Sequence, residues 1–97
     1  MEVKINHNYS ESEALEKMKK FLSKLKEEHQ DKVGGIEENW NGNEGDYSCK
    51  FNGMKLAGHI KVENGQVVVN GKVPFLLKPF ESLIEETIKN EANKVLK

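Results

Sequence analysis

The chain has 97 residues, of which 36% are hydrophobic and 32% are charged. This length fits a single domain over residues 1–97, with one modest core and at most a shallow cleft. Fifteen cationic residues, all of them lysine, stand against sixteen acidic residues and give a formal net charge of -1. Because the charge is near neutral and arginine is missing, the composition argues against nucleic acid as a partner.

The cysteine content and the apolar runs bear on the compartment. Cys49 is the single cysteine, so an intramolecular disulfide and a multi-cysteine zinc site are both excluded. No apolar run approaches the roughly 20 residues that a membrane-spanning helix needs, and the first residues lack the continuous apolar stretch of a signal peptide. We therefore expect a cytoplasmic protein with no transmembrane segment.

The N-terminal third predicts a strand followed by a helix. Apolar residues alternate with polar ones from Val3 to Tyr9, which is typical of a strand with one buried face. Ser10 and Glu13 have the spacing of a helix-capping box. Hydrophobic residues then recur at steps of three and four, which indicates an amphipathic helix of about five turns that ends near residues 31–35.

Two Asn-Gly pairs in the middle of the chain predict tight hairpin turns. A turn at residues 52–53 pairs Tyr47 with Gly58, and a turn at residues 64–65 pairs Gly58 with Gly71. Both turns place the same alternate residues of the shared strand on one face, and this agreement supports an antiparallel meander. A further strand over residues 36–40, with Ile36 and Trp40 facing the core, would join through a loop over residues 41–45.

Two glycines are predicted to face each other on the buried side of this sheet. Gly58 and Gly71 become cross-strand neighbours, and Tyr47 flanks Gly58. One interpretation is a bend in the sheet, or a dent that a helix or the Tyr47 ring fills. The other is a small apolar recess at Tyr47, Gly58 and Gly71 that takes an acyl-like ligand.

The C-terminal third contains a dense apolar segment and a closing helix. Phe75, Leu76, Leu77 and Phe80 fall within six residues. Pro74 precedes them, and Lys78 and Pro79 lie between Leu77 and Phe80. Some of them must anchor the helix that follows, and any that remain exposed would form an apolar patch suited to a lipid, polymer or protein surface. The whole pattern predicts a two-layer α+β sandwich, in which an antiparallel sheet of about five strands carries two helices on one face in the order β-α-β-β-β-β-α, like a miniature helix-grip fold.

Residues for catalysis do not come together in this pattern. His59 lies beside Asp46 on the outer face of the predicted sheet, while Cys49 points to the other face, so no nucleophile stands next to the histidine. The lysines on the outer face fit a solvated surface or an anionic partner. The sequence therefore predicts a non-enzymatic protein with no catalytic residue, no metal site and no cofactor.

The stretch from Lys50 to Leu96 resembles the polyhydroxyalkanoic acid system protein family, small bacterial proteins associated with polyhydroxyalkanoate granules. The resemblance rests on KFNGMKLAGHIKV, on QVVVNGKVPFLLKPF and on the Glu-rich helix after them. It implies a non-enzymatic accessory role at a hydrophobic storage-polymer granule surface or on a granule protein, through Phe75, Leu76, Leu77 and Phe80. The alternative is a soluble binder of a small hydrophobic, acyl-like ligand in a recess between sheet and helices. A homodimer that pairs through an edge strand is a third possibility.

Overall fold

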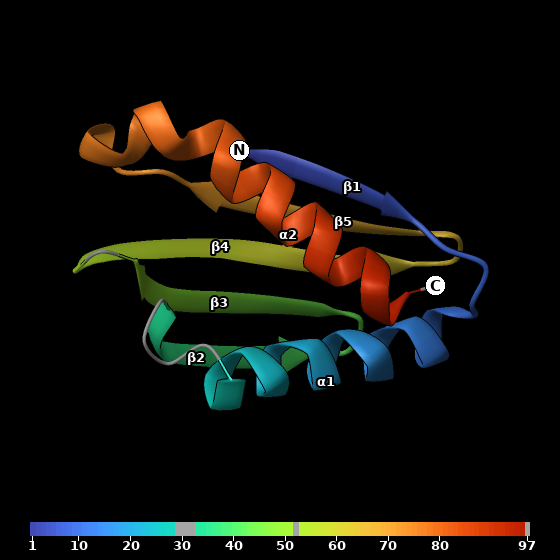
Figure 1. Cartoon of the computed structure of the whole chain (residues 1–97). Helices are drawn as coiled ribbons and strands as arrows, with labels where there is room; N and C mark the ends of the chain where they lie inside the picture. Colours follow the sequence, from blue (N-terminus) through green and yellow to red (C-terminus); the bar gives the residue numbers. More distant parts are fainter. Residues whose placement is uncertain (29–32, 52, 97) are drawn as a thin grey trace.

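The computed structural model describes residues 1–28, 33–51 and 53–96 and shows a sheet covered on one face by two helices (Figure 1). The elements are β1 (Glu2–Asn6), α1 (Glu11–Glu28), β2 (Val33–Asn41), β3 (Glu44–Phe51), β4 (Met54–Glu63), β5 (Gln66–Lys72), the 3-10 helix η1 (Phe75–Phe80) and α2 (Glu81–Val95). All neighbouring strands are antiparallel, in the order β1-β5-β4-β3-β2. This arrangement confirms the predicted fold class.

The registers of the central strands also follow the predicted turns. Tyr47 is opposite Gly58, and Gly58 is opposite Gly71. Gly65 takes the positive φ of 81° that a tight hairpin turn requires, and Gly53 does the same with 78°. Asn52, the first residue of the other predicted turn, lies outside the described residues, as do residues 31 and 32 of the predicted helix end.

The connection between β2 and β3 is shorter than predicted. Asn41 pairs with Glu44, so the five-residue loop expected over residues 41–45 is a turn of only Gly42 and Asn43. Asn43 fixes this turn to β4, since its side-chain amide donates to the Val62 carbonyl at 2.7 Å and its own carbonyl accepts from the Val62 amide at 2.8 Å. The extra pairing lengthens both strands beyond the predicted bounds.

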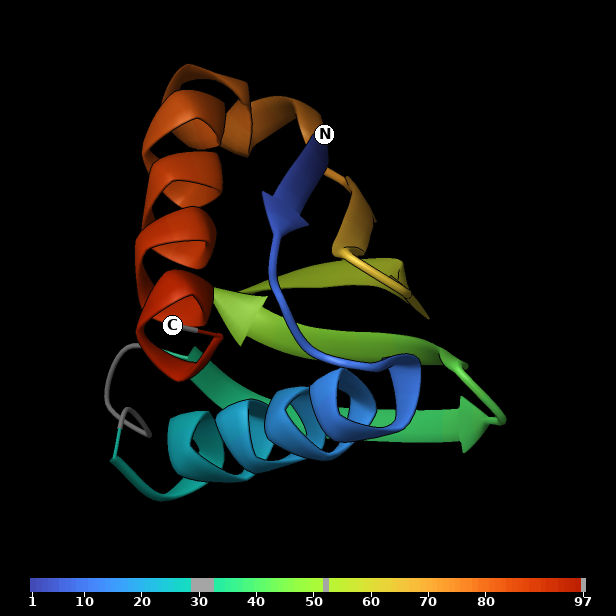
Figure 2. The same cartoon turned by 90° about the vertical axis from the view of Figure 1, so that its right-hand side faces the viewer.

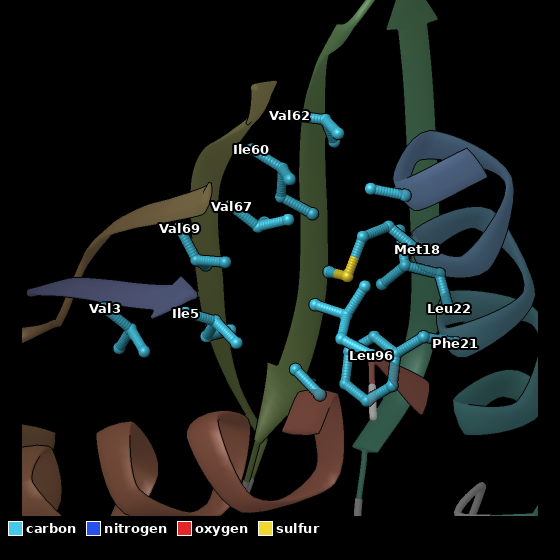
Figure 3. Packing of buried hydrophobic residues seen from close by; sticks show 12 residues of the cluster. Val3, Ile5, Met18, Phe21, Leu22, Ile60, Val62, Val67, Val69 and Leu96 are labelled. Carbon is cyan, nitrogen blue, oxygen red and sulfur yellow. The ribbon is translucent and has the colours of Figure 1, made fainter. Parts of the chain in front are cut away.

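The core lies between the helices and the half of the sheet near β1, β4 and β5 (Figure 3). Val3 and Ile5 of β1 are buried, as the alternation predicted. Figure 3 shows Met18, Phe21 and Leu22 of α1 and Leu96 beyond α2 facing these strands. The buried cluster consists of Val3, Ile5, Ala14, Met18, Phe21, Leu22, Ile60, Val62, Val67, Val69, Ala92 and Leu96.

The two helices approach each other at one end only. The C-terminal end of α2 lies beside α1, whereas the N-terminal end of α2 and the C-terminal end of α1 are far apart in both views (Figures 1 and 2). Ala14 and Ala92 are both fully buried at the closed end, where small side chains let two helices come close. The helices therefore diverge toward the other end.

The start of α1 is capped as predicted. The Glu13 amide donates to Ser10 Oγ at 3.3 Å, and Ser10 Oγ lies 3.1 Å from Glu13 Oε1. The Ser10 carbonyl accepts the first helical hydrogen bond from the Ala14 amide at 2.9 Å. The side-chain link runs between the hydroxyl and the carboxylate, rather than from the carboxylate back to the Ser10 amide as in the usual capping box.

Replacing the capping hydroxyl should weaken the whole domain. We expect Ser10→Ala to lower the free energy of unfolding by about 1 kcal/mol, because a helix amide loses its acceptor. Urea unfolding followed by circular dichroism measures this loss. The matched control is Ser23→Ala, an exposed position within α1, for which we expect a change within about 0.5 kcal/mol. Equal effects of the two substitutions would contradict the capping role.

Candidate functional site

The predicted recess at the facing glycines is filled by the chain itself. A Cβ atom at Gly58 would meet the Asn70 carbonyl oxygen and would lie 2.6 Å from Tyr47 Oη. At Gly71 it would lie 2.7 Å from Met1 Cε and 2.9 Å from the same hydroxyl. The Tyr47 ring thus lies across the glycine pair, which agrees with the interpretation of a dent filled by an aromatic side chain.

A hydrogen bond fixes the Tyr47 ring in the space above the two glycines. Its hydroxyl donates to the Asn70 carbonyl at 3.1 Å. Burial raises the pKa of Tyr47 to about 12, and nearby Cys49 adds to the rise. The phenol therefore stays protonated near neutral pH and serves as a fixed donor.

Beside the tyrosine, the diverging helices enclose an apolar cavity of about 350 Å³. It is larger than the shallow cleft that the chain length predicts, and Gly58 and Gly71 do not line it. Most of the lining side chains are aliphatic, aromatic or thioether groups. They are Met1, Met18, Phe21, Leu22, Leu25, Ile36, Tyr47, Cys49, Leu56, Ile60, Val69, Leu83, Ile84, Thr87, Ile88 and Glu91.

Ile36 and Cys49 form part of the sheet floor of this cavity. The position of Ile36 confirms that it faces the helices, and Trp40 on the same strand packs against the core. Burial raises the pKa of the Cys49 thiol. A thiol that is protonated at neutral pH is a poor nucleophile, so Cys49 contributes to the cavity as a small hydrophobic group.

The apolar segment before α2 is divided between the core and the surface. Phe75 is 86% exposed and Leu76 is 70% exposed, whereas Leu77 is only 1% exposed. Phe80 is also exposed. The structure therefore takes Leu77 out of the predicted surface set and gives it the anchoring role, since the 3-10 helix directs one of these side chains inward and the others outward.

This exposed surface continues onto α2. Leu83 is 57% exposed, follows Phe80 by three residues and lines the cavity. We call Phe75, Leu76 and Phe80 the exposed apolar segment. Sequence reasoning missed Leu83 because its helical spacing fits the buried stripe; the close position of Phe80 one turn earlier was the available signal.

On the outer face of the sheet, His59 contacts two carboxylates, and we call these three residues the histidine cluster. His59 Nδ1 lies 2.9 Å from Asp46 Oδ1 and His59 Nε2 lies 3.2 Å from Glu44 Oε1. Sequence reasoning found Asp46 but missed Glu44, which is a diagonal neighbour across the strands. Over the described ranges, no three His, Cys, Asp or Glu residues group as metal ligands do.

The chain belongs to a known family. The family model described as "Putative polyhydroxyalkanoic acid system protein" matches residues 1–96. The match confirms the resemblance seen in the C-terminal half and extends it over the first strand and helix. No match to this chain is found among curated proteins or among solved structures. None of the described helices is both long enough and apolar enough to span a bilayer.

Substitutions at the glycine pair test the packing of the Tyr47 ring over Gly58 and Gly71, which we call the tyrosine interlock. We expect Gly58→Ala to lower the free energy of unfolding by about 2 kcal/mol or more, because the new methyl group meets a backbone carbonyl that cannot move aside cheaply. Gly71→Ala should cost less, since its neighbours are the ends of two side chains. Gly34→Ala, with no atom within 4 Å of the new methyl group, is the control in urea unfolding. A reversed order of Gly58→Ala and Gly71→Ala would contradict the interlock.

The histidine cluster predicts a measurable titration. The hydrogen bond to Asp46, followed by that to Glu44, raises the pKa of His59 above 6.5. Since the folded-state pKa is raised, the stabilising effect is fully present below the unfolded-state pKa and is lost as the pH rises through the folded-state pKa. NMR titration should show that Asp46→Asn and Glu44→Gln each lower this pKa, while Glu86→Gln on α2 leaves it unchanged. An unchanged pKa in both His59-partner variants would exclude the two contacts in solution.

Proposed function

We propose that this protein is a non-enzymatic accessory protein that associates with the hydrophobic surface of a polyhydroxyalkanoate storage granule in the cytoplasm. The observation that carries the proposal is the exposure of Phe75 and Leu76 in a chain that belongs to the polyhydroxyalkanoic acid system family. Large hydrophobic side chains that stand next to each other on a surface commonly mark an interaction site. Granule proteins are a second partner class with the same apolar chemistry.

The construction of the exposed apolar segment fits contact with a surface. Leu77 is buried below the segment and anchors it to the core. Phe75 and Leu76 can therefore stay exposed to a partner while the segment remains fixed. Lys78 lies on the same turn and its Nζ is 3.4 Å from Glu81 Oε2. Because this exposed ion pair leaves little net charge beside the apolar side chains, the segment favours an uncharged hydrophobic partner over an anionic one.

The pKa of Cys49 and the contacts of His59 support the non-enzymatic part of the proposal. Cys49 has a raised pKa, which is the opposite of what an activated thiolate needs. His59 is engaged with two carboxylates on the outer face of the sheet, and Cys49 lies on the cavity side. These groups do not form a nucleophile and base pair.

Binding to polymer particles tests the proposal. We expect purified protein to co-sediment with polyhydroxyalkanoate particles, and the double variant Phe75→Ser, Leu76→Ser to bind at least tenfold more weakly, because roughly 1.5 to 3 kcal/mol is at stake for each large apolar side chain. The melting temperature should stay near that of the wild type, since both residues are exposed.

Two control variants separate a lost contact from a damaged fold. Val68→Ser removes a hydrophobic side chain from the opposite, outer face and should leave particle binding unchanged. Leu77→Ala should lower the free energy of unfolding by about 2 kcal/mol or more, with little effect on binding by the protein that remains folded. Equal binding of the wild type and the double variant would refute the proposal, as would a wild type that stays in solution.

A further inference from the structure

The cavity between the diverging helices has the features of a ligand site. It has a volume of about 350 Å³, within the lower part of the range of roughly 300 to 1,000 Å³ that small-molecule pockets occupy. The two helices diverge from the C-terminal end of α2 toward its N-terminal end (Figure 2), and both contribute to the lining, α1 with Phe21 and α2 with Ile84 among others. The sheet provides a floor that includes Cys49 and Leu56.

The described residues in the deep part of the cavity offer little to a polar ligand group. The Tyr47 hydroxyl is already bonded to the Asn70 carbonyl, and burial keeps the Cys49 thiol protonated by raising its pKa. Leu22, Ile60 and Val69 add only hydrocarbon surface. A polar ligand group placed there would lose its hydrogen bonds to water without replacement, so the part of a ligand that enters must be hydrocarbon.

The volume limits the length of that hydrocarbon. An apolar cavity of about 150 Å³ holds the six carbons of benzene. By the same ratio, the cavity here holds roughly a dozen carbons. This size fits one alkyl chain of medium length.

The charges beside the cavity bear on the polar end of the ligand. Besides the N-terminal ammonium group of Met1, the described residues that line the cavity contribute one charged side chain, that of Glu91. Its Oε1 atom lies 3.1 Å from Lys94 Nζ, so the carboxylate already has a cation beside it. The Met1 ammonium is also paired, at 3.7 Å from Glu81 Oε1. A carboxylate on the ligand would therefore lose its hydration without gaining an unpaired cation from these groups, whereas an uncharged ester costs less to desolvate and lies near the Thr87 hydroxyl group on the lining.

We propose that this cavity binds one unbranched alkyl chain of about ten to fourteen carbons that carries an uncharged polar head, such as an ester. Leu83 supplies the way in, because it lines the cavity and is also exposed next to Phe80. A chain that reaches the exposed apolar surface can therefore enter past the Leu83 side chain. The site is separate from Phe75 and Leu76 and does not depend on granule association.

The test uses 1-decanoylglycerol as the probe, below its aggregation concentration. Isothermal titration calorimetry should show saturable binding with one site per chain, and saturation should raise the melting temperature by about 3 °C or more. Two substitutions fill the cavity from opposite sides, Cys49→Phe on the floor and Ile88→Phe on α2. Each should weaken binding at least tenfold. Val68→Phe makes a similar change on the outer face and should leave the affinity unchanged.

A second comparison tests the preference for an uncharged head group. Decanoate should bind at least tenfold more weakly than 1-decanoylglycerol at pH 7.5. Glu91→Gln should improve decanoate binding at least threefold and change 1-decanoylglycerol binding by less than twofold, because the substitution releases Lys94 Nζ from its ion pair and only a charged head gains from a free cation. Decanoate that binds the wild type as tightly as the ester would overturn the uncharged-head assignment.

Two results would show that the cavity is not a ligand site. If the wild type shows no saturable binding, or if both filling variants bind as the wild type does, the proposal is wrong. Two filling variants are used so that one that fails to fold leaves the other to decide. The double variant Phe75→Ser, Leu76→Ser should bind 1-decanoylglycerol normally, which distinguishes failure of this site from failure of granule association.

Discussion

Two helices must cover one face of a five-stranded sheet, and how they meet determines the rest of the structure. Ala14 and Ala92 are fully buried where α1 and α2 converge. Their small side chains let the helices approach closely at that end, and the helices diverge toward the other end (Figure 1). Between them the side chains leave a cavity of about 350 Å³. The dense core and the cavity are therefore two consequences of a single helix crossing, since close packing at one end of a rigid pair separates the other end.

Much of the fold could be predicted because local rules specified it. The Asn-Gly turns fixed the pairing of Tyr47 with Gly58 and of Gly58 with Gly71, and the serine at position 10 marked the start of α1. The turn at Gly42 and Asn43 was harder, because several glycines and asparagines in succession permit more than one loop length. Only the contacts of Asn43 with β4 select the short turn.

The candidate sites were less predictable, since they depend on distances that periodicity does not contain. The turn registers placed Tyr47 beside the glycine pair, but the reach of its ring over Gly58 and Gly71 decides that the recess is filled. The cavity depends on the angle between two helices distant in sequence, which no local pattern encodes. Likewise, four apolar residues in six could all have been buried; the tight 3-10 geometry of η1 directs Leu77 inward and leaves Phe75 and Leu76 outside.

The exposed apolar segment and the cavity are connected through the start of α2. Phe80 is exposed one turn before Leu83, and Leu83 belongs to both the surface and the cavity lining. A small domain gains stability mainly by burying such side chains, so exposing Phe75, Leu76, Phe80 and Leu83 gives up hydrophobic stabilisation that packing could have used. If a hydrophobic partner covers the segment, binding recovers part of that stabilisation. The same coverage would place alkyl groups next to the opening of the cavity, and the two proposed sites would then act on one partner, the first by holding its surface and the second by taking in a single chain.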